Sequence, residues 1–418
     1  LILPEEKNLK NYFFKGKEQE FSFMNKTAIK VVLVALIALV TIDHAAGTKL
    51  AVTGRLQSEY HAVHVEGFSS QTALNDPTFF SSWGFRISEN LGNGLKAIGM
   101  IDWGFSNGTG STTGAREQYV ALSKDSLGIL KFGRIHSPFA DYIGGWTIDP
   151  FVYTALQAAG SGGAMIASAN GLGSGAYTAV NSVLRFDSVN FNGFTFVAML
   201  MPGDSSRLEA NLGGLLGGAG SNIGNTGGAN GEWDVQLGTK YEFRYLDHAL
   251  TMFGGYSRDN VSSQQKHNPF VHLKTEEVGR VGGTWAYKNY RLQGQFERVS
   301  NALGAATCSN AAALGDFGDP TRQCNSAMNV GGDGYTWFTS GQYIWGNTSL
   351  VAQGGMTIAH ATDLLQKKNS ENYTLGAIHH LSKRTSIFGG YQRVNVDDPS
   401  SAKDRDRNTW TVGIRHQF

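Results

Sequence analysis

The sequence predicts an all-β protein, a transmembrane antiparallel β-barrel of about sixteen strands, from its composition, its period-two alternation and the spacing of its turns. The 418 residues include 54 Gly but only 8 Pro, and 17% are charged, below the roughly 25% of an ordinary soluble domain. A mean hydropathy of −0.22 is too polar for a bundle of membrane helices. A membrane barrel reconciles these values, because only alternate residues of each strand face lipid.

A single continuously apolar segment, residues 31–40, predicts a secretory signal peptide. It is too short to cross a bilayer as a helix, which takes about 20 residues. Two lysines precede it and small residues follow at 45–47, the arrangement of a signal peptide with its cleavage site; a buried core helix is the alternative. We expect residues 24–47 to be the signal peptide and residues 1–23 to be an upstream extension that the cell's protein lacks.

Removal of these residues would leave the charges balanced. Residues 1–47 contain six Lys and five acidic residues, so the totals of 35 basic and 34 acidic residues both fall to 29. Nucleic-acid binding needs a clustered basic excess, and a net charge near zero gives a nucleic-acid partner no support. Any preference for one sign of ion must therefore come from where individual charges lie.

The two cysteines, Cys308 and Cys324, lie close together in a stretch rich in Gly, Ala and Asn. An even pair in an exported protein predicts a disulfide, which would contribute about 3 kcal/mol in the chain-entropy model. No metal site is predicted, because no Cys-x-x-Cys or His partner pattern surrounds them.

Period-two alternation, the pattern of a barrel strand, is clear in several stretches. From 232 to 245 one set of alternate positions is mainly charged or polar, and the other is mainly aromatic or aliphatic. The stretch from Tyr290 and the stretch ending at Phe418 alternate in the same way, whereas in 385–394 Phe388 would point inward. An amphipathic helix does not give this pattern, because its apolar spacing is near 3.6 residues.

Short turns and long connections alternate along the chain. Seven short turns and eight long loops separate about sixteen strands over residues 48–418, which we interpret as one barrel. An even strand number with short turns at one rim is typical of bacterial barrels, and about sixteen strands leave a water-filled lumen. A soluble β-sandwich is the alternative. Aromatic residues near the short turns fit an interfacial girdle: Phe191, Tyr245, Tyr290, Trp345 and Phe418.

Several motifs stand in order along the chain from about residue 48 to its end. They are SWGFRISENLGNGLKA from Ser82, REQYVALS from Arg116, LKFGR from Leu130, NSVLRFDS from Asn181, SKRTSIFGGY from Ser382 and VGIRHQF ending at Phe418. Together they resemble the Gram-negative trimeric porins of the neisserial and β-proteobacterial type.

The resemblance implies a homotrimer of sixteen-stranded barrels embedded in outer-membrane lipid, each a channel for passive diffusion of small hydrophilic solutes and ions. It also implies that the third long loop, residues 137–180, folds into the barrel and narrows the pore. Phe418 would be read by the barrel-assembly machinery. The chain departs from the family pattern in loops 137–180 and 202–231, which are rich in Gly and Ala, so the shape of the constriction does not follow from the resemblance.

Candidate pore residues come from inward parity and from the loop. Arg55, Arg86 and Arg185 each alternate with polar residues and oppose apolar neighbours, so they are predicted to face the lumen. Asp141 and Asp149 are the carboxylates of loop 137–180. Charges at the narrowest point set the selectivity of a channel, so these five residues are the predicted constriction set.

Arg134 and Lys131 are competing candidates on one strand. The resemblance places pore-facing arginines at Arg86, Arg134 and Arg185, but Arg134 shares parity with Leu130 and Phe132. Lys131 has the inward parity instead. An arginine in hydrocarbon is costly, so either a bulge changes the face there or Arg134 lies above the membrane, and both residues stay candidates.

A basic wall opposed by loop carboxylates predicts a channel with a preference for anions. The alternative is that these arginines only hydrogen-bond the loop and hold it in place. A channel specific for one small anion or organic acid is the competing function. A barrel-borne enzyme is a weaker alternative, since no nucleophile elbow or other catalytic pattern occurs. The mechanism is passive, and no cofactor is implied.

Overall fold

The computed structural model describes residues 46–158 except 78–80, 109 and 111, together with 179–202, 233–260, 275–303, 332–360, 368–397 and 406–418. The predicted signal peptide and upstream extension lie outside the described residues, apart from the last two residues of 24–47, which begin the first strand. Cys308 and Cys324 also lie outside them, so the disulfide stays a prediction.

The described chain is almost entirely β-structure, with two short helical segments. The strands are β1 (Ala46–Val65), β2 (Gln71–Asn75), β3 (Ser82–Gly92), β4 (Leu95–Phe105), β5 (Thr112–Lys124), β6 (Gly128–His136), β7 (Ala179–Ser188), β8 (Phe194–Pro202), β9 (Trp233–Tyr245), β10 (His248–Asp259), β11 (Glu276–Tyr287), β12 (Tyr290–Leu303), β13 (Gly332–Trp345), β14 (Thr348–Ala359), β15 (Lys368–His380), β16 (Thr385–Asp397) and β17 (Arg407–Gln417). The helical segments are α2 (Pro138–Asp141) and the 3-10 turn η1 (Gly145–Thr147).

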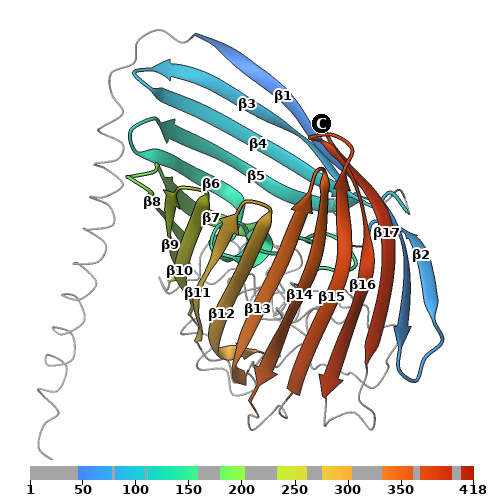
Figure 1. The fold of residues 1–418 in the computed structure, drawn as a ribbon. Coiled ribbons are helices and arrows are strands. Elements are labelled where there is room, and N and C mark those ends of the chain that lie inside the picture. Colours follow the sequence, from blue (N-terminus) through green and yellow to red (C-terminus); the bar gives the residue numbers. More distant parts are fainter. Residues whose placement is uncertain are drawn as a thin grey trace, which may run out of the picture.

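These strands form one closed antiparallel barrel (Figure 1). From β3 onward each strand pairs with the next, and β1 closes the ring by pairing with β17 on one side and β3 on the other. The short strand β2 occupies the same side of β1 as β3, opposite residues 59–63 of β1, so it extends the position of β3. Seventeen strands therefore fill sixteen positions, and the predicted strand number is confirmed.

The barrel is apolar outside and mainly polar inside. In β9, Trp233 and Leu237 are exposed on the outer face, whereas Asp234 and Gln236 are buried on the inner face. This is the alternation that the sequence predicts, because successive side chains of a strand point to opposite faces. Phe388 points inward, as its position in the strand predicts, and its side chain is buried.

Short turns join neighbouring strands at one end of the barrel (Figure 1). Leu246 and Lys288 adopt positive φ in two of these turns, at 52° and 49°. Within the part of the chain that the structure describes, no helix has the length and apolar character needed to cross a membrane. The predicted girdle residues are all exposed or at the outer rim: Phe191, Tyr245, Tyr290, Trp345 and Phe418.

Candidate functional site

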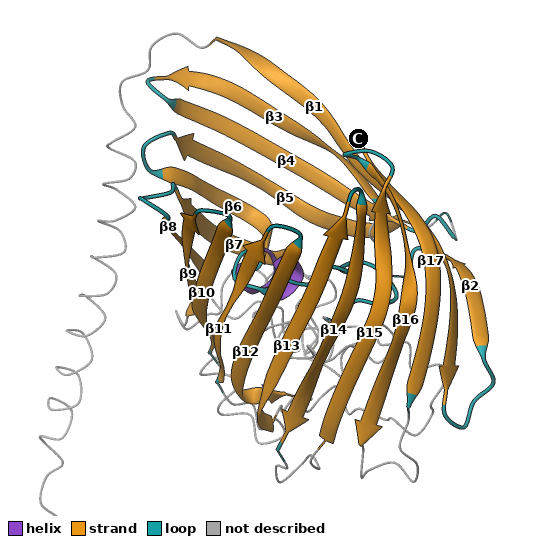
Figure 2. Cartoon of the chain, viewed as in Figure 1, coloured by secondary structure: helices purple, strands orange, loops and turns teal. Residues whose placement is uncertain are grey.

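The described part of the third loop, residues 137–158, crosses the inside of the barrel. Ser137 caps α2 by accepting a hydrogen bond from the Ala140 amide at 3.2 Å, and Pro138 occupies the first turn. This is a favourable helix start, because the cap satisfies a free backbone donor and proline needs none. Figure 2 shows the short helix within the ring of strands.

Apolar residues of the loop pack on an apolar patch of the inner wall. Phe139, Ile143 and Ile148 are fully buried and form one cluster with wall residues of β10 to β13. Without the loop, the inward-facing apolar side chains of the wall would be exposed to the water of the lumen. Packing against the loop removes their apolar surface from water, which is favourable. The wall residues of this cluster are Phe253, Val278, Val299 and Phe338.

A buried ion pair fastens the same part of the loop. Arg280 Nε on β11 lies 2.8 Å from Glu297 Oε2 on β12, and both side chains are fully buried. Nη1 of the Arg280 guanidinium donates to the carbonyl oxygens of Phe139 and Ile143 in the loop. Sequence reasoning missed this pair, although both residues have inward parity on neighbouring strands.

Hydrogen bonds from the opposite wall hold the far end of the loop. Glu59 on β1 accepts from the Ala155 amide at 3.2 Å and from the Thr411 hydroxyl at 2.6 Å. Gln392 on β16 donates to the Leu156 carbonyl at 2.8 Å. Arg415 on β17 donates to the Val152 carbonyl at 3.0 Å, and its guanidinium carbon lies 5.0 Å from the centre of the inward-pointing Phe388 ring.

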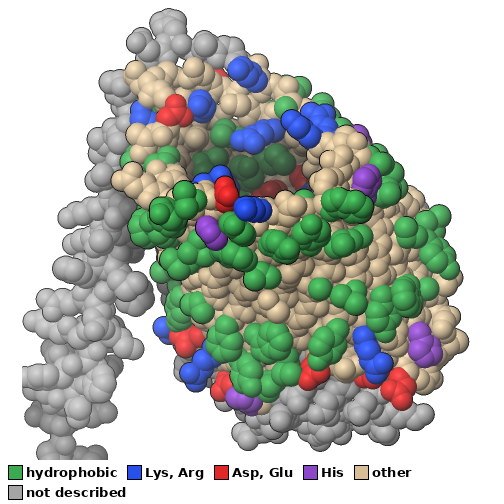
Figure 3. Space-filling model, in the orientation of Figure 1, with side chains coloured by type: hydrophobic (Ala, Val, Ile, Leu, Met, Phe, Trp, Pro, Cys, Tyr) green, Lys and Arg blue, Asp and Glu red, His purple; other side chains and the backbone are tan. Residues whose placement is uncertain are grey.

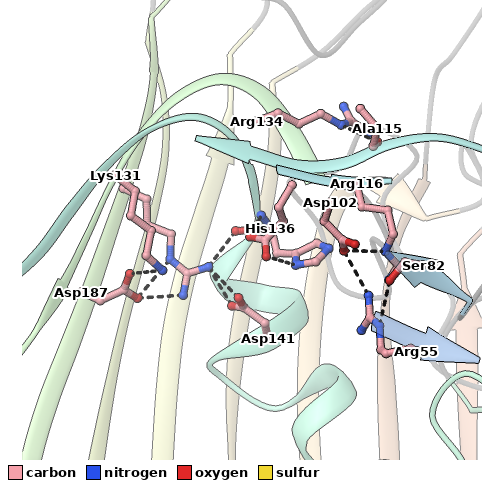
Figure 4. A network of polar contacts seen from close by, with 12 residues as sticks. Arg55, Ser82, Asp102, Ala115, Arg116, Lys131, Arg134, His136, Asp141 and Asp187 are labelled. Carbon is pink, nitrogen blue, oxygen red and sulfur yellow. Dashed lines mark hydrogen bonds and ion pairs between the residues drawn. The ribbon is translucent and has the colours of Figure 1, made fainter. Parts of the chain in front are cut away.

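Arg185 is buried in a network of loop and wall partners, and Figure 4 labels its partners His136, Asp141 and Asp187. Its guanidinium donates to Asp141 at 2.8 Å, to Asp187 at 2.7 Å and to the His136 carbonyl at 2.7 Å. Lys131 on β6 completes the group with an ion pair to Asp187 at 2.9 Å. Glu117 is a third carboxylate beside the group, 3.4 Å from His136. The geometry makes Arg185 a brace for the loop.

Arg134 lies on the outer face of the barrel. It pairs in register with Gln118, whereas Lys131 pairs with Ala121 on the inner face. A register shift does occur nearby, between Gly133 and Ile135, but it leaves Arg134 outside, and its Nε donates to the Ala115 carbonyl at 3.0 Å. Of the two candidates on this strand, Lys131 is the inward residue, and the pore position implied for Arg134 by resemblance is not where the structure places it.

A bulge in β5 brings an additional arginine into the lumen. The register between β4 and β5 shifts between Ile101 and Trp103, and a bulge of this kind changes the direction of a side chain. Arg116 then lies 3.5 Å from Asp102, which also pairs with Arg55 at 3.3 Å. Arg116 has outward parity in the unbroken strand, so sequence reasoning could not find it without knowing the bulge.

Tyr153 of the loop lies against both arginines. Arg55 and Arg116 stand 5.8 and 5.5 Å from its ring centre, and Arg116 Nη2 donates to its hydroxyl at 3.5 Å. Burial raises the pKa of the Tyr153 phenol, although the two arginines partly offset that effect. The phenol is therefore neutral at ordinary pH and adds no negative charge here.

Arg86 differs from the other candidates because it is exposed in the lumen. It has inward parity on β3, where it pairs with Ala51 and Met100. It forms no ion pair with the described part of the chain. Its charge is therefore presented to the water of the lumen.

Both carboxylates of the loop, Asp141 and Asp149, have hydrogen-bond partners within the protein. Asp141 binds Arg185, and the buried Asp149 accepts from the amides of Phe151 at 3.0 Å and Ala158 at 2.6 Å. The predicted arrangement of free loop carboxylates opposite a basic wall is thus replaced by carboxylates that stabilise the loop. The exposed charge that remains from the predicted set is on the wall.

Comparison with known proteins gives the family. A family model described as Gram-negative porin matches residues 32–399. This chain is a Gram-negative porin. An outer membrane porin protein of Bordetella pertussis is 25% identical over 361 residues, covering 81% of this chain and 82% of the relative. A major outer membrane protein P.IA of Neisseria meningitidis serogroup C is 26% identical, covering 83% and 84%.

Solved porin structures share the fold. An anion-selective porin from Comamonas acidovorans superposes with a TM-score of 0.59 at 16% identity, covering 89% of this chain and all of that one. OmpF of Salmonella typhi, in complex with daunomycin, gives the same TM-score at 15% identity. The chain is therefore an outer-membrane protein of the Gram-negative porin family, and its barrel is a channel for small solutes.

The terminal residue of this porin closes the barrel seam. The backbone of Phe418 exchanges hydrogen bonds with Gly54 at 3.0 and 3.1 Å. Its ring lies over that glycine, where a Cβ would stand 2.2 Å from the ring. Its reading by the barrel-assembly machinery stays a prediction.

Proposed function

We propose that this porin is a general diffusion channel with a preference for small anions, and that it assembles as a homotrimer. The observation that carries the anion preference is the exposed Arg86 on the same inner wall as Arg55 and Arg116, which share one carboxylate, Asp102. A lumen lined by charge of one sign enriches ions of the opposite sign.

The other cations at the loop are balanced by carboxylates and so add no positive charge. Arg185 and Lys131 are balanced by Asp141 and Asp187, and Asp149 faces loop amides. Glu117 adds one further carboxylate beside them, 3.4 Å from His136, so the proposed preference rests on Arg86, Arg55 and Arg116. The solved Comamonas acidovorans porin is described as anion-selective, and OmpT of Vibrio cholerae is described in a trimer form; both properties are proposals for this chain.

The test is the reversal potential across a KCl gradient in a planar bilayer. The parent channel should reverse toward chloride and open in groups of three conductance steps. Arg86→Gln should lower the chloride-to-potassium permeability ratio about fivefold, since a unit charge about 8 Å from a passing ion attracts chloride and repels potassium by roughly 0.5 kcal/mol each in water.

Arg134→Gln is the matched control, because it removes the same charge from the outer face of the barrel. Its reversal potential should equal that of the parent. A parent that reverses toward potassium, or an Arg86→Gln channel with unchanged selectivity, would contradict the proposed anion preference.

A further inference from the structure

A cavity between the loop and the barrel wall opens toward the short-turn end. Its volume is about 330 Å³, and it is bounded by Thr147, Asp149 and Pro150 of the loop and by residues of β12 to β17. Sites for small ligands span about 300–1,000 Å³, so this one suits a small solute. Figure 3 shows the hollow mouth of the barrel at this end, with Lys and Arg side chains around it.

The lining of this cavity, here called the basic vestibule, has an excess of positive charge. Arg291 from β12, Lys383 and Arg384 from the β15–β16 turn, and Arg415 from β17 all line it. Asp149 is the one acid among the fifteen described residues of the lining. Four permanent cations and one carboxylate leave three positive charges in excess.

The single carboxylate is turned toward the loop backbone. Both oxygens of Asp149 accept loop amide hydrogen bonds, at 3.0 and 2.6 Å. The side chains of Arg291, Lys383 and Arg384 are exposed and form no ion pair with the described residues. These three cations of the basic vestibule are therefore available to a ligand from solution.

Further hydrogen-bonding groups stand beside these cations in register. His380, Ser386 and Arg415 form one row across β15, β16 and β17. The hydrogen bond from Arg415 to the Val152 carbonyl fixes that guanidinium at the inner end of the vestibule. Cations combined with hydroxyl donors are the groups that recognise carboxylates and phosphates.

We propose that the basic vestibule is a binding site for small divalent oxyanions of the phosphate or dicarboxylate class, on the short-turn side of the loop. The proposal deepens the anion-preferring channel proposed above and rests on it. Attraction grows with ligand charge, so a dianion would occupy the vestibule where chloride only passes. The spread of cations from β12 to β17 also allows two acidic groups of one ligand to be held at once.

The test is block of single-channel chloride current by inorganic phosphate and, separately, by succinate, at fixed ionic strength. Both the parent and the double variant Arg291→Gln with Arg384→Gln would be measured. The parent current should fall with concentration in one or both arms, which identifies the ligand class. The double variant should need about tenfold more ligand for half-block, because it loses two nearby charges.

Arg244→Gln is the matched control. Arg244 is exposed on β9, one residue from a short turn, and does not line the basic vestibule, so its loss should leave the half-blocking concentration within twofold of the parent. No block by either anion, or equal block of parent and double variant, would overturn the site while a reversal potential toward chloride leaves the channel assignment intact. A parent channel that prefers potassium would refute the proposed function itself.

Discussion

Two parts of the inner wall use charge in opposite ways. On β1, β3 and β5 the arginines face the lumen, with Arg86 exposed to water. On β11 and β12 the pair Arg280–Glu297 is fully buried beneath the loop and bonded to its backbone. All these residues point to the inner face of the barrel. Strand alternation alone therefore does not distinguish a charge that lines the pore from one that holds the loop in place. The path of the loop decides which residues meet water.

Arg185 shows how this difference can mislead. It has the inward parity of Arg86, yet it is buried and bonded to Asp141, Asp187 and a loop-end carbonyl. It belongs with Arg280 in function, because both hold residues 137–158 in place. Four substitutions sharpen the contrast between bracing and lining charges.

Arg280→Ala should give the largest loss of stability. It leaves Glu297 buried without its partner, which costs about 3–5 kcal/mol, and it frees the loop carbonyls of Phe139 and Ile143. We expect a lower unfolding temperature of the barrel in detergent and a larger, noisier single-channel conductance. Arg280→Met combined with Glu297→Leu should recover most of the stability, because it removes both charges. A stable, quiet Arg280→Ala channel would show that the pair does not hold the loop.

Arg185→Gln should be the next most damaging change. Hydrogen bonds to charged groups contribute about 1.5–3 kcal/mol each, and the variant weakens several at once, so we expect a loss of about 2–4 kcal/mol. Chemical unfolding of the folded barrel measures it. Lys131→Gln, which loses one ion pair to Asp187, is the milder comparison. Selectivity altered by Arg185→Gln with no change in stability would make Arg185 a lining charge after all.

Gly255→Ala should displace the loop by steric contact. A Cβ at Gly255 would lie 2.1 Å from Ile143 Cδ1 and 2.8 Å from the Leu237 carbonyl oxygen. Overpacking of this kind costs about 1–3 kcal/mol, and conductance noise should report the displaced loop. Gly279→Ala is the control, because nothing described lies within 4 Å of its Cβ position. Equal behaviour of the two variants would contradict the close seating of Ile143.

Arg86→Gln should change stability least. Surface substitutions away from buried contacts stay within about 0.5 kcal/mol, and the Arg86 side chain forms no ion pair with a described residue. Its unfolding temperature should match that of the parent while its reversal potential shifts toward potassium. A marked loss of stability would place Arg86 among the bracing residues.

Much of the fold could be predicted because it depends on local pattern. The alternation in 232–245 assigns Asp234 to the lumen and Trp233 to lipid, as the structure confirms. Alternation failed where the ladder is irregular. The register shift in β5 brings Arg116 inside against its parity, and nothing in REQYVALS marks a bulge.

The sequence by itself determined the strand number and the outer and inner faces, because a period of two and the spacing of turns are local properties. The inward path of the third loop was expected from the family resemblance alone. Only the tertiary structure decided which inward charges are free. Residues 137–158 contact strands from β1 to β17 that are distant in sequence. Burial, ion pairing and the shape of the basic vestibule arise from those long-range contacts, which no short pattern encodes.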